Sequence, residues 1–462
     1  MIINSKLWLN LKSKAINGQQ KISVIGVGYV GLCTAVGLAS KGYFVTACDI
    51  DPEKIKKINR GIPPFYEPDL QEKLSECIKK GTLKGLHKQT NRAIEETDFT
   101  FVAVGTPSKP DGSIDLKYIE EAAGNIGLAL KEKETYHVII IKSTVAPGTT
   151  QNLVKPILEQ KSNKKCGKDF GLCMNPEFLR QGSAFNDTLN ADRVVIGSYD
   201  QRSGDSLEAL YRDFYKPQAP PIIRTTLSTA ELIKYASNAM LATKISFINT
   251  IANICEKIPS ADVKVVAKAM GLDKRIGPLF LDAGLGYGGS CFPKDVKALI
   301  ACSKNFGYDP ELLESTENVN KKQPLKAVAL ARQQLGTLKD KKIAILGLAF
   351  KPDTDDMREA RVIPIINQLI AEDAHVVAYD PVASSTAKFI FKSEITYTTS
   401  LSSCLQDTDL CILVTEWPEF KNLKPEDFIK YMKHPNLIDG RRIYNPQEFR
   451  EKLNFTAIGL GP

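Results

Sequence analysis

The chain has 462 residues, of which 43% are hydrophobic and 25% are charged, which is the composition of an ordinary globular protein. This length allows two or three domains, each with its own core. Lys and Arg outnumber Asp and Glu by 61 to 53, a net charge of +8, and no block of basic residues resembles a nucleic-acid-binding arm. No apolar run approaches the roughly 18 residues that a membrane span needs. We therefore expect neither a nucleic acid nor a membrane as a partner.

The cysteines and histidines give no sign of a metal centre. Ten cysteines occur without a CxxC pair, and four histidines are scattered along the chain, so neither a metal site nor a disulfide framework is indicated. A reducing, cytoplasmic setting is expected. Residues 1–20 contain short apolar groups that asparagines and lysines interrupt, so we predict an N-terminal extension and no signal peptide.

The first structural motif is a glycine-rich turn. A short apolar run at 21–25 leads into GVGYVG (26–31), a helical stretch follows to residue 40, and a second strand-like run ends at Asp49. Such a turn between a strand and a helix binds a pyrophosphate, and an acid about twenty residues later binds a ribose hydroxyl. Asp49 has no arginine beside it and would repel a 2'-phosphate. The segment therefore predicts a domain that binds NAD and disfavours NADP.

Three further strand-like runs each end in a polar loop. The runs and loops are 99–104 before Gly105-Thr106-Pro107, 137–141 before Ser143-Thr144, and 171–174 before Asn175-Pro176-Glu177. Each loop taken alone has the composition of an ordinary turn. In a parallel sheet, however, all three would share the carboxyl edge, where ligands bind. Alternating strands and helices through residue 200 predict a doubly wound α/β domain.

A long helix is predicted after the prolines at 217, 220 and 221, which mark a boundary. Residues 228–231 read Ser-Thr-Ala-Glu, the form of a capping box, and no Gly or Pro occurs before Pro259, so the helix has about thirty residues. Six positions with helical spacing share one face: 234, 238, 241, 245, 248 and 252. Four of these are apolar, and Lys234 and Asn238 extend the stripe.

A lysine in such a stripe loses hydration, which lowers its pKa and suits it to proton handling. The alternative for Lys234 is a side chain that snorkels to solvent from the helix end. Between Tyr235 and Cys255 only Lys244 is charged, so more than one face of the helix should be buried. We expect this helix to form the spine of a domain and a subunit interface.

The most distinctive stretch is GYGGSCFPKD at 286–295. Its glycines let the backbone approach a ligand closely, and the ammonium of Lys294 favours the thiolate of Cys291, which is the nucleophilic form. A cysteine taken at random is more often a small buried hydrophobic residue. The polar, glycine-rich surroundings of Cys291 favour covalent catalysis instead.

The C-terminal region repeats the first motif in weaker form. A helical segment at 310–336 precedes a strand at 342–346 that enters GLAFK (347–351), and another strand ends at Asp380. Further strands are predicted at 410–414 and 436–438. This region could hold a nucleotide-like ligand whose phosphates pair with Lys351, Arg358, Arg441 and Arg442, although such residues more often serve solubility.

The chain is therefore predicted to be an α/β protein with two Rossmann-like doubly wound domains, joined by a long central helix and a helical middle domain. The expected divisions are an extension (1–20), an NAD-binding Rossmann domain (21–215), a central helical domain with a dimerisation surface and Cys291 (216–336), and a C-terminal domain (337–462). The C-terminal domain could hold a nucleotide-like ligand, which the family resemblance given next implies to be a UDP-sugar.

Nine motifs in this order resemble the UDP-glucose dehydrogenase branch of the nucleotide-sugar dehydrogenases, over residues 21–446. They are GVGYVG, VGTP, KST (142–144), NPEFL (175–179), ELIKYASN (231–238), GYGGSCFPKD, AFKPDTDDMRE (349–359), TEWPEF (415–420) and DGRR. The resemblance implies oxidation of the 6-hydroxyl of UDP-glucose to a carboxylate, with two molecules of NAD. A thiolate suits this chemistry, because aldehyde oxidation needs a covalent adduct from which hydride can leave. Cys291 would form a thiohemiacetal and then a thioester, and water would release UDP-glucuronate.

The resemblance also implies a role for each matching residue. In catalysis, Lys234 and Asn238 would hold the oxyanion, Asp295 and Thr144 would position a water, and Glu177 would assist thioester hydrolysis. The cofactor would contact Gly26, Gly28, Val30, Gly31, Asp49, Lys54, Thr106, Thr144, Gln181, Lys294 and Arg358. The substrate would contact Glu177, Phe178, Leu179, Arg180, Gln181, Lys234, Asn238, Phe280, Gly288, Lys351 and Arg441, together with Arg275 from a neighbouring subunit.

Two positions depart from the pattern of that family. Gln181 stands where a glutamate is usual, which leaves the role of that carboxylate open. The proline after KSTV falls one residue late, at Pro147, which affects the loop beside Thr144.

Several rival functions are compatible with parts of the sequence. GDP-mannose 6-dehydrogenase shares the cysteine chemistry, although TEWPEF and AFKPDTDDMRE favour UDP-glucose. UDP-N-acetylhexosamine dehydrogenases tend to lack the Pro-Lys-Asp that follows Cys291 here. A single-step hydroxyacid dehydrogenase would leave Cys291 without a role, and a non-catalytic nucleotide sensor would not need Cys291, Lys234, Asn238 and Asp295 together. As a partner we expect a second copy of the chain, in a homodimer or a larger homo-oligomer.

Overall fold

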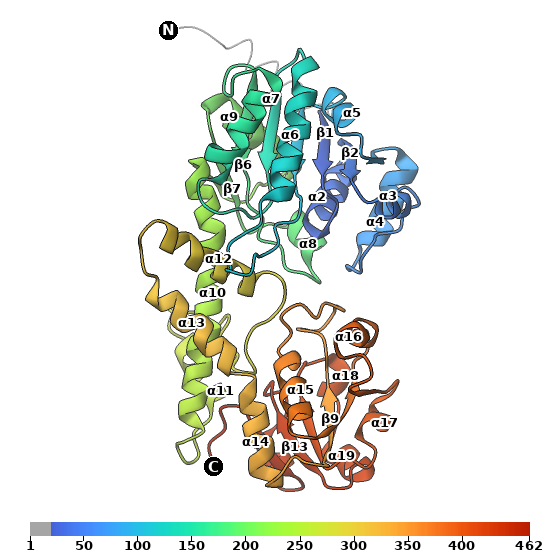
Figure 1. Ribbon diagram of the computed structural model, residues 1–462, viewed down its shortest axis with the longest axis vertical. Helices are drawn as coiled ribbons and strands as arrows, with labels where there is room; N and C mark the ends of the chain where they lie inside the picture. The colour runs from blue at the N-terminus through green and yellow to red at the C-terminus, as the bar shows by residue number, and fades with distance from the viewer. Residues whose placement is uncertain (1–19) are drawn as a thin grey trace. The chain divides into compact units, whose positions relative to one another are not determined.

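The computed structural model describes residues 20–462 (Figure 1), so nearly all of the predicted N-terminal extension lies outside the described residues. The described chain forms two compact units, one ending at Ala236 and the other beginning at Ser237. Each unit contains a largely or wholly parallel sheet with helices packed on it. The predicted α/β class with two Rossmann-like sheets is confirmed.

The first sheet has eight strands in the order β3-β2-β1-β4-β5-β6-β7-β8. They are β1 (Lys21–Ile25), β2 (Phe44–Asp49), β3 (Leu83–His87), β4 (Phe99–Val102), β5 (His137–Ile141), β6 (Phe170–Met174), β7 (Val194–Ser198) and β8 (Ile222–Thr225). Neighbours pair in parallel except β6 and β7, which are antiparallel. Strand β8 follows the prolines at 217–221 and still pairs with β7, so the first sheet continues beyond them.

Successive residues of the central strands point to opposite faces of this sheet, as the strand geometry requires. Val24 and Phe101 pack in one cluster with α2, whereas Ile25 and Ile139 pack in another with α6. The helices are α2 (Tyr29–Ser40), α3 (Pro52–Ile58), α4 (Leu70–Lys80), α5 (Thr90–Glu95), α6 (Lys117–Glu132), α7 (Lys155–Ser162), α8 (Ala184–Leu189) and α9 (Gln201–Phe214), with a π-helical turn η1 (Thr150–Val154). Both faces are therefore covered, as expected for a doubly wound sheet.

Helix α10 (Leu227–Cys255) has the predicted length, with 29 residues, but the predicted capping box is wrong. The hydroxyl of Thr226 accepts the amide of Thr229, so the helix starts earlier than expected. Glu231 then lies one turn inside the helix, where its carboxylate accepts the amides of Gly148 (2.6 Å) and Thr150 (2.8 Å). Glu231 thus caps η1 and not its own helix.

The predicted buried stripe of α10 is present. Lys234, Asn238, Ile248 and Ala252 are buried, whereas Leu241 and Ile245 are half-buried. The helices that follow are α11 (Val263–Gly271), α12 (Phe292–Asn305), α13 (Glu311–Lys322) and α14 (Leu325–Leu335). The single helical segment expected at 310–336 is thus two helices, and the break falls at Pro324, whose nitrogen cannot donate to the preceding turn.

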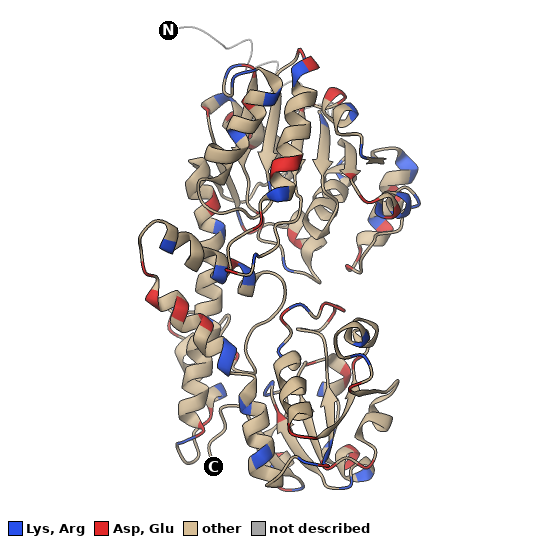
Figure 2. Cartoon of the chain, viewed as in Figure 1, with Lys and Arg blue, Asp and Glu red and all other residues tan. Residues whose placement is uncertain are grey.

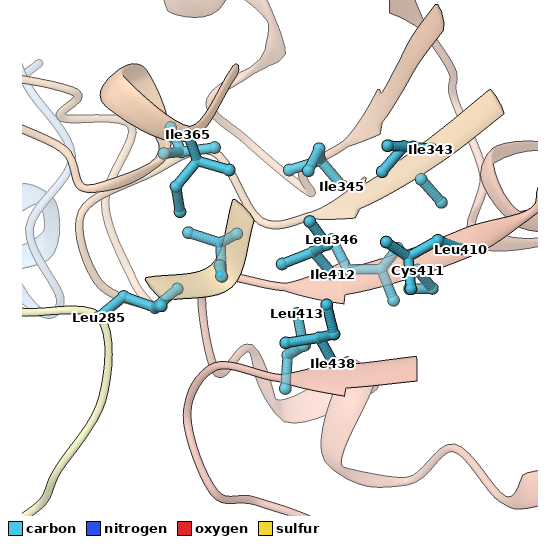
Figure 3. Packing of buried hydrophobic residues seen from close by; sticks show 14 of the residues in the cluster. Leu285, Ile343, Ile345, Leu346, Ile365, Leu410, Cys411, Ile412, Leu413 and Ile438 are labelled. Carbon is cyan, nitrogen blue, oxygen red and sulfur yellow. The ribbon is translucent and has the colours of Figure 1, made fainter. Parts of the chain in front are cut away.

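The second sheet has six parallel strands in the order β11-β10-β9-β12-β13-β14. The strands are β9 (Lys342–Leu346), β10 (His375–Tyr379), β11 (Thr396–Tyr397), β12 (Leu410–Leu413), β13 (Asn436–Asp439) and β14 (Asn454–Ala457). The helices are α15 (Val362–Ala371), α16 (Ser384–Phe391), α17 (Leu401–Leu405), α18 (Pro418–Lys421), α19 (Pro425–Tyr431) and α20 (Pro446–Arg450). Figure 3 shows the core of this sheet, and Leu285 belongs to the same buried cluster as Leu413 and Ile438 from the strands.

Charged residues of both signs are mixed within each unit (Figure 2). The net charge of +8 is thus distributed, as expected for a solvated surface. Among residues 20–462, no helix combines the length and apolar character needed to cross a membrane.

Candidate active site

The glycine-rich turn between β1 and α2 is shaped for a dinucleotide. Gly26 has φ +89°, and a Cβ on Gly31 would lie 1.8 Å from the carbonyl oxygen of Gly26, so neither position accepts a side chain. A Cβ on Gly28 would meet nothing within 4 Å, so its backbone is open to a ligand. Within the described chain, the start of α2 has no side-chain cap, and its amides can face an anion.

Asp49, at the end of β2, lies beside this turn. Its carboxylate accepts the amides of Val27 (2.8 Å) and Asp51 (2.9 Å), and the residue stays half-exposed. A carboxylate held in this way can still accept a ribose hydroxyl. Lys54 lies nearby in the first turn of α3, which Asp51 caps. These residues fit the adenosine half of NAD.

The loops after β4, β5 and β6 meet at the carboxyl edge, as the sequence predicted. The hydroxyl of Thr106 donates to the carbonyl of Thr144 (2.9 Å), and the hydroxyl of Ser143 donates to the carbonyl of Val104 (2.7 Å). The first two of the loops are thereby bonded to each other. Lys142, at the end of β5, donates to the side chain of Asn175 in the third (2.9 Å).

Glu177 is the charged centre of this edge. It is 8% exposed, its carboxylate lies 3.1 Å from the ammonium of Lys234, and it accepts the amide of Leu179 at 2.6 Å. Burial alone would raise the pKa of Glu177, but Lys234, the Leu179 amide and the nearby Lys142 together lower it. Glu177 is therefore held as a carboxylate. Burial lowers the pKa of Lys142 to about 8.

The segment after Glu177 carries several residues that the resemblance assigns to ligands. Phe178 lies under Arg193, whose guanidinium is 3.9 Å from the ring centroid. Arg180 is exposed and pairs with Asp187 (2.6 Å). Gln181 is half-buried in the following turn, whose shape is fixed by buried Glu67. Glu67 accepts the amide of Gly182 at 2.9 Å.

Cys291 lies in the second unit, immediately before α12. All ten cysteines fall in the described part of the chain, and only Cys291 is exposed. Its backbone carbonyl accepts the amide of Asp295 (2.8 Å), and the hydroxyl of Ser290 lies 3.6 Å from its sulfur. The positive end of the α12 dipole favours negative charge at this position. The sulfur is therefore both accessible and placed where a thiolate is stabilised.

The segment that leads to Cys291 is fixed along its length. The side chain of Asn320 accepts the amide of Tyr287 (2.8 Å) and donates to its carbonyl (3.1 Å). The amide of Gly289 donates to the carbonyl of Arg358 (2.9 Å). A Cβ on Gly289 would lie 2.7 Å from the ring of Phe350, so only glycine fits. The cysteine loop is therefore hydrogen-bonded at Tyr287 and Gly289 although it has no regular structure.

Asp295 follows Cys291 by one helical turn and is buried. Its carboxylate accepts the amide nitrogen of Asn238 at 2.6 Å and pairs with Lys294 at 2.6 Å. Asn238 lies one turn beyond Lys234 on α10. The second unit thus brings Asn238, Asp295 and Cys291 onto neighbouring turns of two helices.

The remaining predicted ligand residues lie in loops of the second unit. Lys351 is half-buried, and Arg358 is exposed and pairs with Asp356 (2.6 Å). Arg441 donates to the carbonyl of Val414 (2.6 Å). Arg275 is exposed and pairs with Asp273 (2.6 Å).

Phe280 lies before the cysteine loop, and Gly288 lies within it. Phe280 adopts φ +65°, and its ring lies 6.1 Å from that of Phe292. A Cβ on Gly288 would lie 2.5 Å from the carbonyl oxygen of Glu359. Gly288 is thus needed for close packing, whatever else it contacts.

The prediction that Arg442 could pair with a phosphate is wrong. Arg442 is 4% exposed, and its guanidinium bonds Asp262 at 2.6 Å. Its charge is therefore already neutralised inside the protein. Asp262 lies 180 residues earlier, so the sequence around Arg442 gave no sign of this pairing.

Lys142, Asn175 and Glu231 lie in three of the recognised motifs, but the sequence alone did not assign them to the site. Lys142 directly follows a buried strand, and Asn175 follows the next one. A polar residue directly after a buried parallel strand was the signal that could have identified both. Glu231 was misread as a local cap because its partners lie about 80 residues earlier.

These features together are those of an NAD-dependent dehydrogenase. The chain belongs to the UDP-glucose/GDP-mannose dehydrogenase family. Three models of that family match it: the NAD binding domain at residues 20–215, the central domain at 228–322 and the UDP binding domain at 344–446.

Individual relatives resemble the chain over nearly its whole length. It is 43% identical to the UDP-glucose 6-dehydrogenase TuaD of Bacillus subtilis, over 93% of this chain and 91% of that protein. It is 41% identical to the UDP-glucose 6-dehydrogenase AglM of Haloferax volcanii, over 95% and 100%. A solved UDP-glucose dehydrogenase from Pyrobaculum islandicum superimposes with a TM-score of 0.88 at 37% identity, covering 96% of this chain and 98% of that one.

Proposed function

We propose that the chain is a UDP-glucose 6-dehydrogenase that converts UDP-glucose into UDP-glucuronate by a four-electron oxidation. The observation that carries the proposal is the exposed Cys291, which follows a hydrogen-bonded, glycine-rich loop at the start of α12, in a chain whose relatives are named UDP-glucose 6-dehydrogenases. NAD, when bound, would supply the hydride acceptor for each of the two oxidations. The other steps are assigned to side chains of the protein.

The first oxidation needs a group that stabilises the alkoxide as the 6-hydroxyl loses its proton. Lys234 and Asn238, on the buried face of α10, supply an ammonium and an amide for this purpose. Asp295, which Lys294 and Asn238 hold, takes part with Thr144 in positioning a water for proton transfer. The product of this step is an aldehyde.

The second oxidation proceeds through Cys291. The thiolate attacks the aldehyde carbon, a C–S bond forms, and the resulting thiohemiacetal can lose a hydride to become a thioester. Glu177, held as a carboxylate by Lys234, then accepts a proton from the water that attacks the thioester. The C–S bond breaks, Cys291 leaves as a thiolate, and the acid is released.

UDP is proposed to bind the second unit, where Lys351 and Arg441 lie in loops at the carboxyl edge of the second sheet. Arg441 lies two residues after β13, and a Cβ on Gly284 would lie 3.3 Å from its guanidinium. Gly284 therefore leaves room for the arginine. Phe280 and Gly288 line the sugar side in this proposal, and Arg275 comes from a neighbouring subunit.

The stoichiometry of NADH tests the proposal. Wild-type protein should release two NADH per UDP-glucose, whereas a single-step hydroxyacid dehydrogenase would release one from its own substrate. Cys291→Ser and Cys291→Ala should abolish formation of UDP-glucuronate, with Cys302→Ser as the control for removing a thiol. Turnover of GDP-mannose with no turnover of UDP-glucose would overturn the choice of substrate.

A homodimer formed through α10 is part of the proposal. Met240, Phe247 and Ile254 recur every seven residues on one face of α10 and are 60%, 48% and 49% exposed. A repeating apolar face of this kind is typical of a helix that packs against a second copy. Phe247→Glu should lower the mass seen by light scattering to that of a monomer, and Lys257→Glu, near the end of the same helix, should not.

We also propose a cytoplasmic location. The Cys291 thiolate is active only while reduced, and the cytoplasm keeps thiols reduced. Fractionation of cells that express the chain should recover the dehydrogenase activity with cytoplasmic markers.

A further inference from the structure

A cavity of about 90 Å³ lies within the first unit, and the loop after β6, which carries Glu177, forms part of its wall. Buried residues line one end of it, including Lys142, Asn175 and Glu177, whereas exposed residues such as Asn190 and Asp192 line the other. The cavity therefore leads from the surface to the side chain of Glu177. We call it the Glu177 cavity.

The buried end of the Glu177 cavity is polar. The hydroxyl of Tyr211 and the ammonium of Lys142 both donate to the side-chain oxygen of Asn175, at 2.5 and 2.9 Å. The nitrogen of Asn175 donates to the carbonyl of Val195 (2.8 Å), which fixes the orientation of the amide. Cavities with polar walls of this kind hold ordered water, whereas apolar cavities stay empty.

Lys142 gives an independent sign of water. An ammonium has three N–H donors, and among the described residues that of Lys142 donates to Asn175 alone. Lys142 is 8% exposed, and buried donors in folded proteins are satisfied by protein groups or by ordered water. The remaining donors of Lys142 therefore need water, and the cavity that it lines is where this water can lie.

The volume agrees with this conclusion. A cavity needs a volume of about 10–15 Å³ that the centre of a water-sized sphere can occupy if it is to hold one water. The Glu177 cavity, at about 90 Å³, therefore has room for several. A chain of waters could extend from the exposed rim to the carboxylate.

We propose that the Glu177 cavity binds the water that hydrolyses the thioester and refills from solvent through its exposed rim. This inference rests on the proposed function, in which Glu177 takes the proton of that water. Hydride transfer benefits from a site that excludes bulk water. The hydrolytic step nevertheless consumes one water for each product. A route from the surface of the first unit to Glu177 meets both requirements, because it supplies water to this carboxylate through the cavity alone.

The test narrows the cavity at Ala191, a half-buried residue of its wall without a role in the proposed chemistry. Ala191→Val and Ala191→Leu put progressively larger side chains there. Ala219→Leu is the matched control, because Ala219 is equally half-buried but lies outside the cavity, in the loop before β8. NAD binding and the melting temperature of each variant are measured alongside activity.

Rapid mixing with UDP-glucose and NAD then separates the steps. In the Val and Leu variants the first two NADH per site should form at the wild-type rate, and the later steady rate should fall in order of side-chain size, by about five-fold or more for Leu. Acid-quenched protein should carry the sugar acid on the peptide that contains Cys291. If Ala191→Leu does not fold, the Val variant still gives the comparison.

The outcomes distinguish the cavity from the function. A normal steady rate in the Val and Leu variants overturns the cavity proposal and leaves the proposed function intact. Equal losses in the burst and in the steady rate also overturn it, because the effect would not be specific to hydrolysis. If wild-type protein forms no second NADH from UDP-glucose, the proposed function fails before the cavity is tested.

Discussion

The two sheets begin alike but differ at the aspartate that ends or follows the second strand of each pair. Asp49 in the first sheet is left open to a ligand, whereas Asp380 in the second has its carboxylate fully hydrogen-bonded within the protein. In each, the first strand enters a turn whose glycine has a positive φ, Gly26 at +89° and Gly347 at +96°. In each, the next strand ends at or just before an aspartate, Asp49 or Asp380. The turns therefore share a backbone plan.

The two aspartates have different partners. Asp49 accepts two backbone amides and is half-exposed. Asp380 is 3% exposed and accepts four backbone amides and the indole nitrogen of Trp417. A carboxylate has about four acceptor sites, so Asp380 has none left for a ribose. The second turn keeps the plan of the first, but its acid stabilises the loop that carries Lys351.

The largest effect is expected at Asp380. Asp380→Ala would leave buried amides and the Trp417 indole without an acceptor and should reduce the free energy of unfolding by about 3–5 kcal/mol. Asp49→Ala should reduce it by less, about 1–2 kcal/mol, because only two amides lose their acceptor and that of half-exposed Asp51 can reach water. Urea unfolding measures both. Equal losses would contradict the comparison.

A third carboxylate, Glu231, also accepts backbone amides, and the pH dependence of the free energy of unfolding tests whether it is charged. Its burial raises its pKa from 4.5 to about 7, against the amides that it accepts. The folded chain therefore binds an extra proton between these pH values, and the stability from this group is lost as pH rises from about 4.5 to about 7.

The free energy of unfolding of wild type should fall over this range by no more than about 3 kcal/mol relative to Glu231→Gln, which cannot ionise. Urea unfolding of both proteins at several pH values measures the difference. A difference that stays constant with pH would show that the amides alone keep Glu231 charged.

A smaller effect is expected at Asp49. Asp49→Asn removes the charge that a ribose hydroxyl would meet and should raise the KM for NAD about ten-fold. Val27 and Asp51 donate to different oxygens of Asp49, so one amide also loses its acceptor, at a cost of about 1 kcal/mol in stability. The matched control is Asp51→Asn, because Asp51 caps α3 and asparagine caps helices equally well. If both variants raise the KM alike, the effect comes from the loop and not from the ribose contact.

No effect on cofactor binding is expected from restoring the glycines of the second turn. Ala349→Gly with Pro352→Gly recreates the GxGxxG spacing after β9. Asp380 would still be fully engaged, and the next helix, α15, starts only at Val362, so no helix N-terminus faces the turn. Calorimetry should find one NAD per chain, as in wild type, and a second NAD would break the comparison.

Features set by local pattern were predictable from the sequence. The strands at 21–25 and 342–346, the length of α10 and its buried stripe all follow from periodicity and from the placement of Gly and Pro. The shared edge of Thr106 and Thr144 followed from the rule that parallel strands end at one side of the sheet.

Features set by distant partners were not predictable. The local sequence predicts Arg442 as a phosphate ligand, but its guanidinium pairs with the distant Asp262. It likewise predicts Glu231 as the cap of its own helix, but the Glu231 carboxylate accepts the distant amide of Gly148. Lys142 lies in the KST motif, but its burial depends on how β5 packs between β4 and β6 in the sheet. The sequence identified which side chains could do the chemistry, whereas pairing in space decides which of them remain available.

The anchoring of the segment before Cys291 has a consequence for its motion. Leu285 lies in the core of the second sheet, and Asn249 accepts the amide of Gly284 at 2.8 Å. Although residues 284–291 form an irregular, glycine-rich coil, their bonded amides should exchange with deuterated solvent as slowly as those of a central strand. The same stretch should resist proteases that cut ordinary surface coils.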